Sequence, residues 1–422
     1  EGYTSGELWE GWGAGTINGA FGFHYREDEI NDTPAEIIRQ GNAWGSSRAG
    51  ITAGSDTTTA LFGELDIPII SNKTGFEQLT LNLSGRWTDV DSYGDDTTYK
   101  VGINWQITPS WRFRANTGTS FRTPALFELY LADETSFVQQ RFLDPCIQWG
   151  GAVDEGRISQ RVADNCAATV TEDYPDGLPA DYTGGNITAT VISRGGFGRL
   201  EAETSKSSTI GLVWQPGFAN LSVSVDYFDI EVNDQVDQLG TSIPIGCYSS
   251  EFFPEDPLCG LFDRSGINSS IENVQDDFIN VATQTNKGWD VALQWITDLW
   301  GGQFMLDTQH TFQTEAVTAL FEGFERDVNG QFGEPEWVGR LWLTSAKNDL
   351  SYFWGIDMVG DVSNHESYGN GEYKDDALYR GETVRVVLAA DDVFYHTFSA
   401  TKYFGNDQEW RASLGVRNAF DE

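Results

Sequence analysis

The chain has 422 residues and a formal net charge of −38, from 64 Asp and Glu against 26 Lys and Arg. This charge excludes a general nucleic-acid binder, because such a protein needs a basic surface to neutralise phosphates. With 46 Gly, 26 Phe, 15 Tyr and 15 Trp, the composition predicts an all-β chain. The sequence contains no apolar run of about 18 residues, the length that a transmembrane helix needs.

Apolar and polar residues alternate in segments of about 10–14 residues, which is the pattern of half-buried strands. In the segment 96–107, Val101, Ile103 and Trp105 share one face, and Lys100 and Asn104 share the other. The pattern predicts thirteen strands, at about 15–27, 57–70, 76–90, 96–107, 110–121, 198–215, 219–232, 278–297, 302–315, 336–346, 350–362, 391–404 and 409–418.

Short and long connections alternate between these strands. Apart from a short tip at 91–95, the links at one end are long, at about 28–56, 122–197, 233–277, 316–335 and 363–390. Short turns at one end and long loops at the other are typical of an outer-membrane barrel. We therefore predict a transmembrane antiparallel β-barrel. The alternative is a soluble sandwich, in which Leu81, Ile103 and Trp105 would lie in a dry middle layer.

Several arginines lie on the polar face of the predicted strands, which in a barrel would line a wet lumen. They are Arg86, Arg112, Arg114, Arg411 and Arg417. Long-loop aromatic residues could stack on sugar rings or on the planar groups of a siderophore, or could pack the loops on themselves. These residues are Trp149, Phe197, Tyr248, Phe252 and Phe253.

The four cysteines form two pairs that are close in sequence, Cys146 with Cys166 and Cys247 with Cys259, and both pairs lie in the two longest links. An even count with local spacing fits a compartment that permits disulfides. We predict pairing within each local pair, although four cysteines allow more than one connectivity and four unrelated buried thiols are the alternative reading.

The chain shows no signature of catalysis or of a cofactor site. Its four histidines are scattered without metal-ligand spacing, and it contains no nucleophile elbow, P-loop or dinucleotide fingerprint. We therefore expect no metal, no cofactor and no enzymatic activity.

Five short motifs occur in order along the chain. The run from Ser120 to Tyr130 includes Phe121, Arg122, Pro124, Glu128, Leu129 and Tyr130. Pro124 cannot extend a strand ladder, so a strand ends there and a long loop begins. The others are Ala60–Ile70, Gly85–Gly94, Leu200–Ser205 (with Ala202 where a proline is usual) and Gly415–Asp421. Together they resemble the motifs of TonB-dependent outer-membrane receptors, and the Cys247–Cys259 loop is similar to a proteobacterial subgroup of that family.

The resemblance implies a barrel of about 22 strands with a plugged lumen. We expect residues 1–422 to form the C-terminal part of that barrel, with about eight strands, the plug domain, the TonB box and the last strand outside this chain, because an open sheet cannot lie in lipid with unpaired edges. The wall arginines would then contact acidic residues of the plug.

The same resemblance implies a function in the bacterial outer membrane. The receptor would import a scarce nutrient, such as a siderophore, vitamin, oligosaccharide or peptide. Its partners would be TonB, its own plug, outer-membrane lipid and lipopolysaccharide, and the small-molecule or oligosaccharide ligand, but no nucleic acid. The alternatives are a passive porin-like channel and a secreted acidic carbohydrate-binding β-protein.

Overall fold

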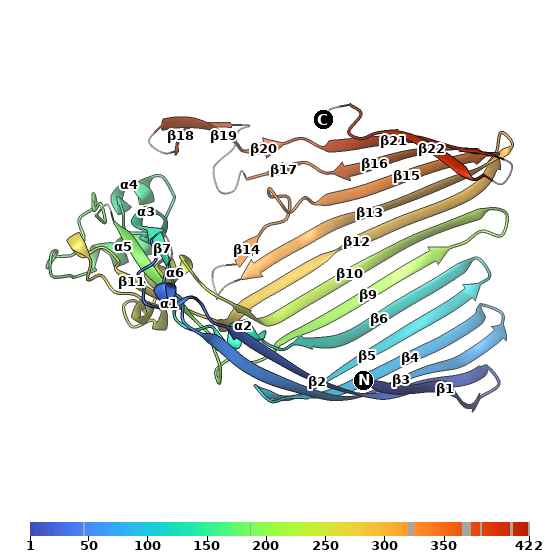
Figure 1. Ribbon diagram of the computed structural model, residues 1–422, viewed down its shortest axis with the longest axis horizontal. Coiled ribbons are helices and arrows are strands. Elements are labelled where there is room, and N and C mark those ends of the chain that lie inside the picture. Colours follow the sequence, from blue (N-terminus) through green and yellow to red (C-terminus); the bar gives the residue numbers. More distant parts are fainter. Residues whose placement is uncertain are drawn as a thin grey trace.

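The computed structural model describes residues 1–44, 47–185, 187–319, 325–364, 373–379, 382–405 and 408–420. Most of the chain forms one antiparallel sheet in which neighbours in sequence are neighbours in space (Figure 1). Its strands in order are β1 (Gly2–Gly11), β2 (Gly15–Asp32), β3 (Thr52–Lys73), β4 (Phe76–Val90), β5 (Gly94–Thr108), β6 (Trp111–Arg122), β9 (Glu203–Trp214), β10 (Asn220–Asp237), β12 (Ile279–Leu299), β13 (Gly302–Ala319), β15 (Trp337–Lys347), β16 (Leu350–Val359), β21 (Val393–Phe404) and β22 (Trp410–Val416).

The connections of this main sheet differ at its two ends. At one end they are the short turns 12–14, 74–75, 109–110, 215–219, 300–301, 348–349 and 405–409. At the other end they are 33–51, 91–93, 123–202, 238–278, 320–336 and 360–392. The connections are therefore short at one end of the sheet and, apart from 91–93, long at the other. Parts of the predicted links 316–335 and 363–390 lie outside the described residues.

Small strands accompany the main sheet at the end with the long connections. β14 (Glu325–Asp327) pairs with β13, β17 (Val362–Ser363) pairs with β20 (Ala389–Ala390), and β18 (Tyr373–Tyr379) pairs with β19 (Glu382–Val387). The link 33–51 contains the short helix α1 (Glu36–Arg39). Among the described residues, no helix has the length and apolar character needed to cross a membrane.

The apolar face of the main sheet is exposed. Register places Phe23 opposite Leu61 and Ile103 opposite Ala115, so the apolar side chains of successive strands form rows. Six of these side chains are 41–57% exposed: Phe21, Phe23, Leu61, Ile103, Ile210 and Leu212. A soluble sandwich would bury these rows between two layers, so that alternative is wrong. An exposed apolar band on alternating positions is what the lipid-facing side of a membrane barrel requires.

The sequence prediction missed strand β1 and misplaced several boundaries. In β1 a bulge between Glu7 and Trp9 shifts the register. The strand therefore lacks a continuous alternation of apolar and polar residues, which is the pattern used to predict the other strands. β2 and β3 extend into the predicted link 28–56, whereas the predicted strand at 198–215 begins only at Glu203. Residues before Glu203 instead fold back, and the Leu200 amide bonds to the Gly196 carbonyl.

Candidate functional site

The two longest links fold together into one body at the end of the sheet (Figure 1). We call residues 123–202 and 238–278 the cap. The first link contains α2 (Leu126–Tyr130), β7 (Glu134–Gln139), α3 (Gln140–Leu143), α4 (Trp149–Asp154), α5 (Gln160–Ala167) and β8 (Thr188–Arg194). The second contains α6 (Ser242–Ser249), the 3-10 helices η1 (Pro257–Leu261) and η2 (Ile267–Ser269), and β11 (Asn273–Asp277).

A three-stranded sheet joins the two links of the cap. β8 pairs antiparallel with β7 from its own link and parallel with β11 from the other. One side of this small sheet is buried, with Ala189 fully covered and Val191 and Val274 packed in the same cluster as Leu143 and Ile271. The cap therefore has a hydrophobic core of its own, which keeps two links in a single folded unit.

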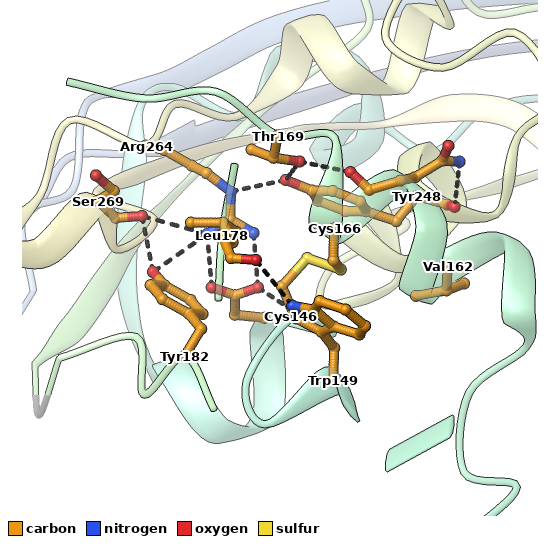
Figure 2. Close-up of a disulfide and its surroundings, with 12 residues drawn as sticks. Cys146, Trp149, Val162, Cys166, Thr169, Leu178, Tyr182, Tyr248, Arg264 and Ser269 are labelled. Atoms are coloured by element: carbon orange, nitrogen blue, oxygen red, sulfur yellow. Dashed lines mark hydrogen bonds and ion pairs between the residues drawn. A yellow bond between two sulfur atoms is a disulfide. The ribbon is translucent and has the colours of Figure 1, made fainter. Parts of the chain in front are cut away.

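Both predicted disulfides are formed. Cys146 bonds to Cys166, and Cys247 bonds to Cys259. Figure 2 shows the first of them beside Trp149, Val162 and Leu178. Cys146, Cys166 and Cys247 are fully buried in a second cluster, which draws residues from both links. Each disulfide closes a loop within one link, and the packing between the disulfides joins the links.

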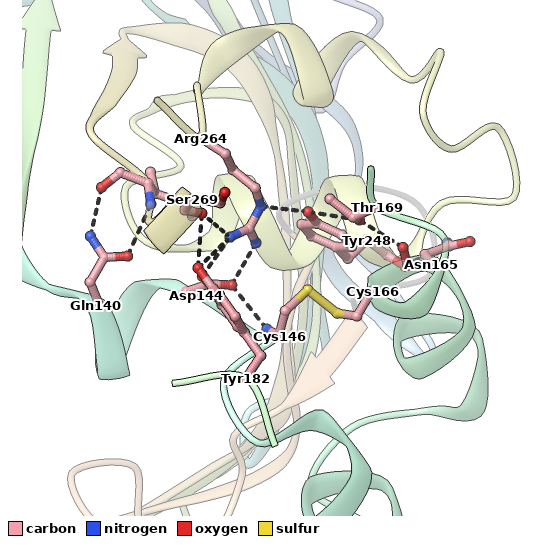
Figure 3. Close-up of polar contacts among 11 residues, drawn as sticks. Gln140, Asp144, Cys146, Asn165, Cys166, Thr169, Tyr182, Tyr248, Arg264 and Ser269 are labelled. Atoms are coloured by element: carbon pink, nitrogen blue, oxygen red, sulfur yellow. Dashed lines mark hydrogen bonds and ion pairs between the residues drawn. A yellow bond between two sulfur atoms is a disulfide. The ribbon is translucent and has the colours of Figure 1, made fainter. Parts of the chain in front are cut away.

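A buried ion pair links the two halves of the cap (Figure 3). The Arg264 side chain is 7% exposed and that of Asp144 is 0% exposed. The Arg264 Nη1 and Nη2 atoms donate to the two carboxylate oxygens of Asp144, each at 2.7 Å. Such a bidentate pair has both charge and directional hydrogen bonds. Asp144 also accepts from the Cys146 amide at 3.0 Å, so the pair touches the disulfide.

Two tyrosines surround this ion pair. Arg264 Nε donates to the Tyr248 hydroxyl at 2.8 Å, and the Tyr182 hydroxyl donates to the Ser269 carbonyl at 2.8 Å. Burial raises the pKa of both phenols. Burial alone would lower the pKa of Arg264, but the adjacent Asp144 carboxylate outweighs it and the net pKa is raised. Arg264 therefore stays protonated, and both phenols stay neutral, at physiological pH.

Side-chain amides complete the contacts between the links. Gln140, which is 2% exposed, donates through Nε2 to the Ile271 carbonyl at 2.6 Å and accepts from the Ile271 amide at 3.2 Å. Asn165 donates to the carbonyls of Tyr248 and Ser250. These bonds satisfy backbone groups that would otherwise be buried without partners.

The motif at the end of β6 forms the junction between the cap and the main sheet. Arg122 bonds to Glu128 at 3.0 and 3.1 Å and also contacts Glu203, the first residue of β9. Glu203 accepts from the Val236 amide of β10 at 2.8 Å, so one cluster of charges joins three strands. The Glu128 carboxylate also accepts from the Ala125 amide, at the start of α2.

Apolar contacts support this junction. Leu129 is 2% exposed and packs with Leu200 and Val236. The rings of Tyr130 and Phe197 stack at 5.0 Å, and the Tyr130 hydroxyl donates to the Ser55 carbonyl of β3. The motif that ends a strand in the sequence therefore anchors the cap in the structure.

Three of the five predicted wall arginines have partners on the sheet itself. Arg114 Nε and Nη2 donate to the Asp226 carboxylate at 2.7 and 2.6 Å, reaching across β9 where a Cβ at Gly211 would collide with that carboxylate. Arg86 lies over the Phe62 ring at 5.6 Å. Arg411 Nε donates to Ser413. Arg112 belongs to β6 and Arg417 follows β22, so the structure does not bring the five arginines into one cluster.

A family model described as TonB dependent receptor-like, beta-barrel matches residues 2–419. The chain belongs to this family. It is accordingly part of a bacterial outer-membrane β-barrel, as the exposed apolar face of the sheet requires. No curated protein sequence matches the chain.

Solved structures of other TonB-dependent receptors share the fold. The ferric enterobactin receptor PfeA from Pseudomonas aeruginosa is 15% identical with a TM-score of 0.59, covering 100% of this chain and 48% of the receptor. The siderophore receptor PirA from Acinetobacter baumannii is 11% identical with a TM-score of 0.59, covering 100% and 49%. FpvA from P. aeruginosa is 13% identical with a TM-score of 0.51, covering 100% and 44%. The chain thus spans about half the length of these receptors.

In this TonB-dependent receptor barrel, the predicted loop aromatics divide into two groups. Trp149 donates to the Leu178 carbonyl, and Tyr248 is buried with Phe253 against its ring at 5.1 Å. These three residues pack the cap. Phe197, although 57% exposed, stacks on Tyr130 at the junction, whereas Phe252 is 66% exposed.

Sequence reasoning missed a groove of about 860 Å³ in the cap. The residues that line it are Gln139, Gln140, Arg141, Ile147, Thr183, Gly185, Ile187, Thr188 and Asn268. The alternating pattern at 188–194 was a detectable signal for β8, but no local signal joins residue 268 to it. Among the described residues, no group of histidine, cysteine or acidic side chains could hold a metal ion.

Proposed function

We propose that this chain forms the ligand-capturing end and part of the wall of a receptor that imports a scarce nutrient across the outer membrane. The observation that carries the proposal is the cap, in which two long links fold into one unit through two disulfides and a buried ion pair. A cap with its own core presents a preorganised surface, which reduces the entropy lost when a ligand binds.

Transport in this proposal depends on partners outside the described residues. A plug blocks the lumen, and TonB supplies the energy that moves it. Outer-membrane lipid and lipopolysaccharide contact the apolar face of the sheet, and the ligand contacts the cap. A passive porin-like channel would differ in needing neither plug nor TonB, and neither function involves an enzymatic step.

The test is accumulation of labelled nutrient in cells that carry the complete gene. We expect accumulation to disappear when TonB is deleted or the inner-membrane proton gradient is collapsed. Equal accumulation in cells with and without TonB would show a passive channel and contradict the proposal. A strain lacking the receptor gene gives the background.

We further propose that the polar face of the sheet lines the lumen and that its arginines hold the plug. Because Arg114 is already paired with Asp226, a double change Arg112→Gln and Arg114→Gln should act mainly through Arg112. We expect greater leakage of large antibiotics through the outer membrane than in an Arg161→Gln control, a change in the cap. Unchanged leakage would contradict this role.

A further inference from the structure

The cap is strongly acidic, but most of one face of its small sheet, up to its end at Arg194 and Asp277, carries no charged side chain. The two links contain 19 Asp and Glu against six Arg and no Lys. Four of those arginines, Arg157, Arg194, Arg199 and Arg264, form ion pairs with carboxylates of the cap. The field around the cap is therefore negative, and it disfavours the approach of anionic ligands.

The uncharged face follows from the register of the three strands. Phe137 lies opposite Thr190 and Gln139 opposite Thr188, while Thr190 is also level with Asn273 on β11. Partners in register lie on the same side of a sheet. Since Val138, Ala189 and Val274 point into the core, these residues point away from it. We call Phe137, Gln139, Thr188, Thr190, Asn273 and Gln275 the neutral face.

The neutral face is open and leads into the groove. Phe137 is 62% exposed, and Gln139, Thr188 and Gln275 are also exposed. Gln139 and Thr188 belong to both surfaces, because they line the groove of about 860 Å³. This volume lies within the range of small-molecule sites. Charged residues of this side of the sheet come at its end, where Asp277 accepts from Arg199 at 2.9 Å.

The chemistry of these side chains matches sugar hydroxyls. Amide and hydroxyl groups both donate and accept hydrogen bonds, as sugar hydroxyls do. A ring such as Phe137 offers a flat apolar surface to the C–H face of a pyranose. The charged residue lining the groove is Arg141, which lies 4.5 Å from the centre of the 63% exposed Phe142 ring. This stacking fixes a planar set of donors at the groove, beside a second exposed ring.

We propose that the neutral face and the groove form the docking site of a neutral oligosaccharide. The inference rests on the proposed receptor function and adds its substrate class. An anionic chelate or an acidic saccharide would meet the negative field of the cap. At the groove it would find one cationic side chain, Arg141. A neutral chain of sugars uses the amides, hydroxyls and rings together.

The experiment uses the complete receptor, purified in detergent. Calorimetric titrations compare neutral oligosaccharides of glucose, xylose, mannose and N-acetylglucosamine with an oligogalacturonate and a ferric siderophore. We expect a neutral oligosaccharide to bind, and Phe137→Ala or Gln139→Ala to weaken its binding by about five- to tenfold. Val170→Ala, which shortens a 67% exposed apolar side chain elsewhere in the cap, should leave the dissociation constant unchanged.

Three results would overturn the inference. The first is that no neutral oligosaccharide binds. The second is that the wild type and both variants of the neutral face bind it equally. The third is that only the acidic saccharide or the chelate binds, and that Arg141→Gln loses this binding. Amide exchange of the cap in each variant shows that the fold is intact. Saccharide binding without TonB-dependent uptake would contradict only the proposed function, whereas TonB-dependent uptake without saccharide binding would contradict only this inference.

Discussion

Removal of the Arg264 guanidinium tests whether the two links of the cap form one cooperative unit. In Arg264→Leu the Asp144 carboxylate, whose side chain is 0% exposed, keeps the Cys146 amide but loses both hydrogen bonds from the guanidinium. Breaking a buried ion pair at one partner costs about 3–5 kcal/mol, because the remaining charge stays in a poorly solvating site. If the cap opens locally, its opening constant rises by roughly 100- to 5,000-fold.

Amide hydrogen exchange of the detergent-solubilised receptor measures this opening directly. We expect faster exchange at β7, β8 and β11, which belong to both links, and unchanged exchange at β4 and β5 of the main sheet. The double variant Asp144→Asn with Arg264→Met removes both charges but keeps an acceptor for the Cys146 amide. It should recover much of the protection, because an apolar replacement of an ion pair is often close to neutral. Unchanged exchange in Arg264→Leu, or equal damage in both variants, would refute the reasoning.

Three further changes probe the cap. Replacing Cys146 and Cys166 by alanine removes a crosslink with a sequence separation of 20, which should cost about 3 kcal/mol and speed proteolysis between them. Equal proteolysis of the variant and the wild type would count against a stabilising role. Asp276→Asn should stabilise the cap at neutral pH, because burial raises the pKa of that carboxyl while an amide oxygen still accepts from the Gly240 amide. Slower amide exchange would show this, and faster exchange would contradict it. Burial also raises the pKa of Tyr182 and Tyr248 above the ordinary 10.0. The stability that the two neutral phenols give the cap is therefore complete below pH 10.0 and falls as the pH rises above it. Phenolate absorbance should appear together with loss of amide protection, and titration of both phenols near pH 10 in an intact cap would contradict this.

The strands of the main sheet could be predicted because each one repeats the same local rule. A strand with one face in lipid alternates along its length, and Val101, Ile103 and Trp105 show this without reference to any other segment. The exception supports the explanation. β1 pairs with β2 along its length, but the bulge between Glu7 and Trp9 shifts the register, so the alternation changes face within this short strand and the local rule fails there.

The cap could not be predicted in the same way, because its contacts join residues far apart in the chain. Asp144 and Arg264 are 120 residues apart, and Gln140 and Ile271 are 131 apart. Local signals existed for single elements, such as Ser159, which caps α5 by accepting from the Val162 amide. No such signal says that β8 pairs in parallel with β11 from another link, so both the neutral face and the groove emerge only in the folded chain.

The motif that carried the family resemblance and the residues that we assign to ligand recognition occupy different parts of the cap. Arg122, Glu128 and Glu203 tie the first link to three strands of the wall, and such a junction is needed whatever the ligand is. Phe137 and Gln139 lie beyond this junction, on a sheet that the junction holds in place. A shared anchor with a separate binding face allows members of one family to keep the same barrel while their caps change ligand. The resemblance therefore identifies the barrel, whereas the ligand has to be inferred from the uncharged face of the cap.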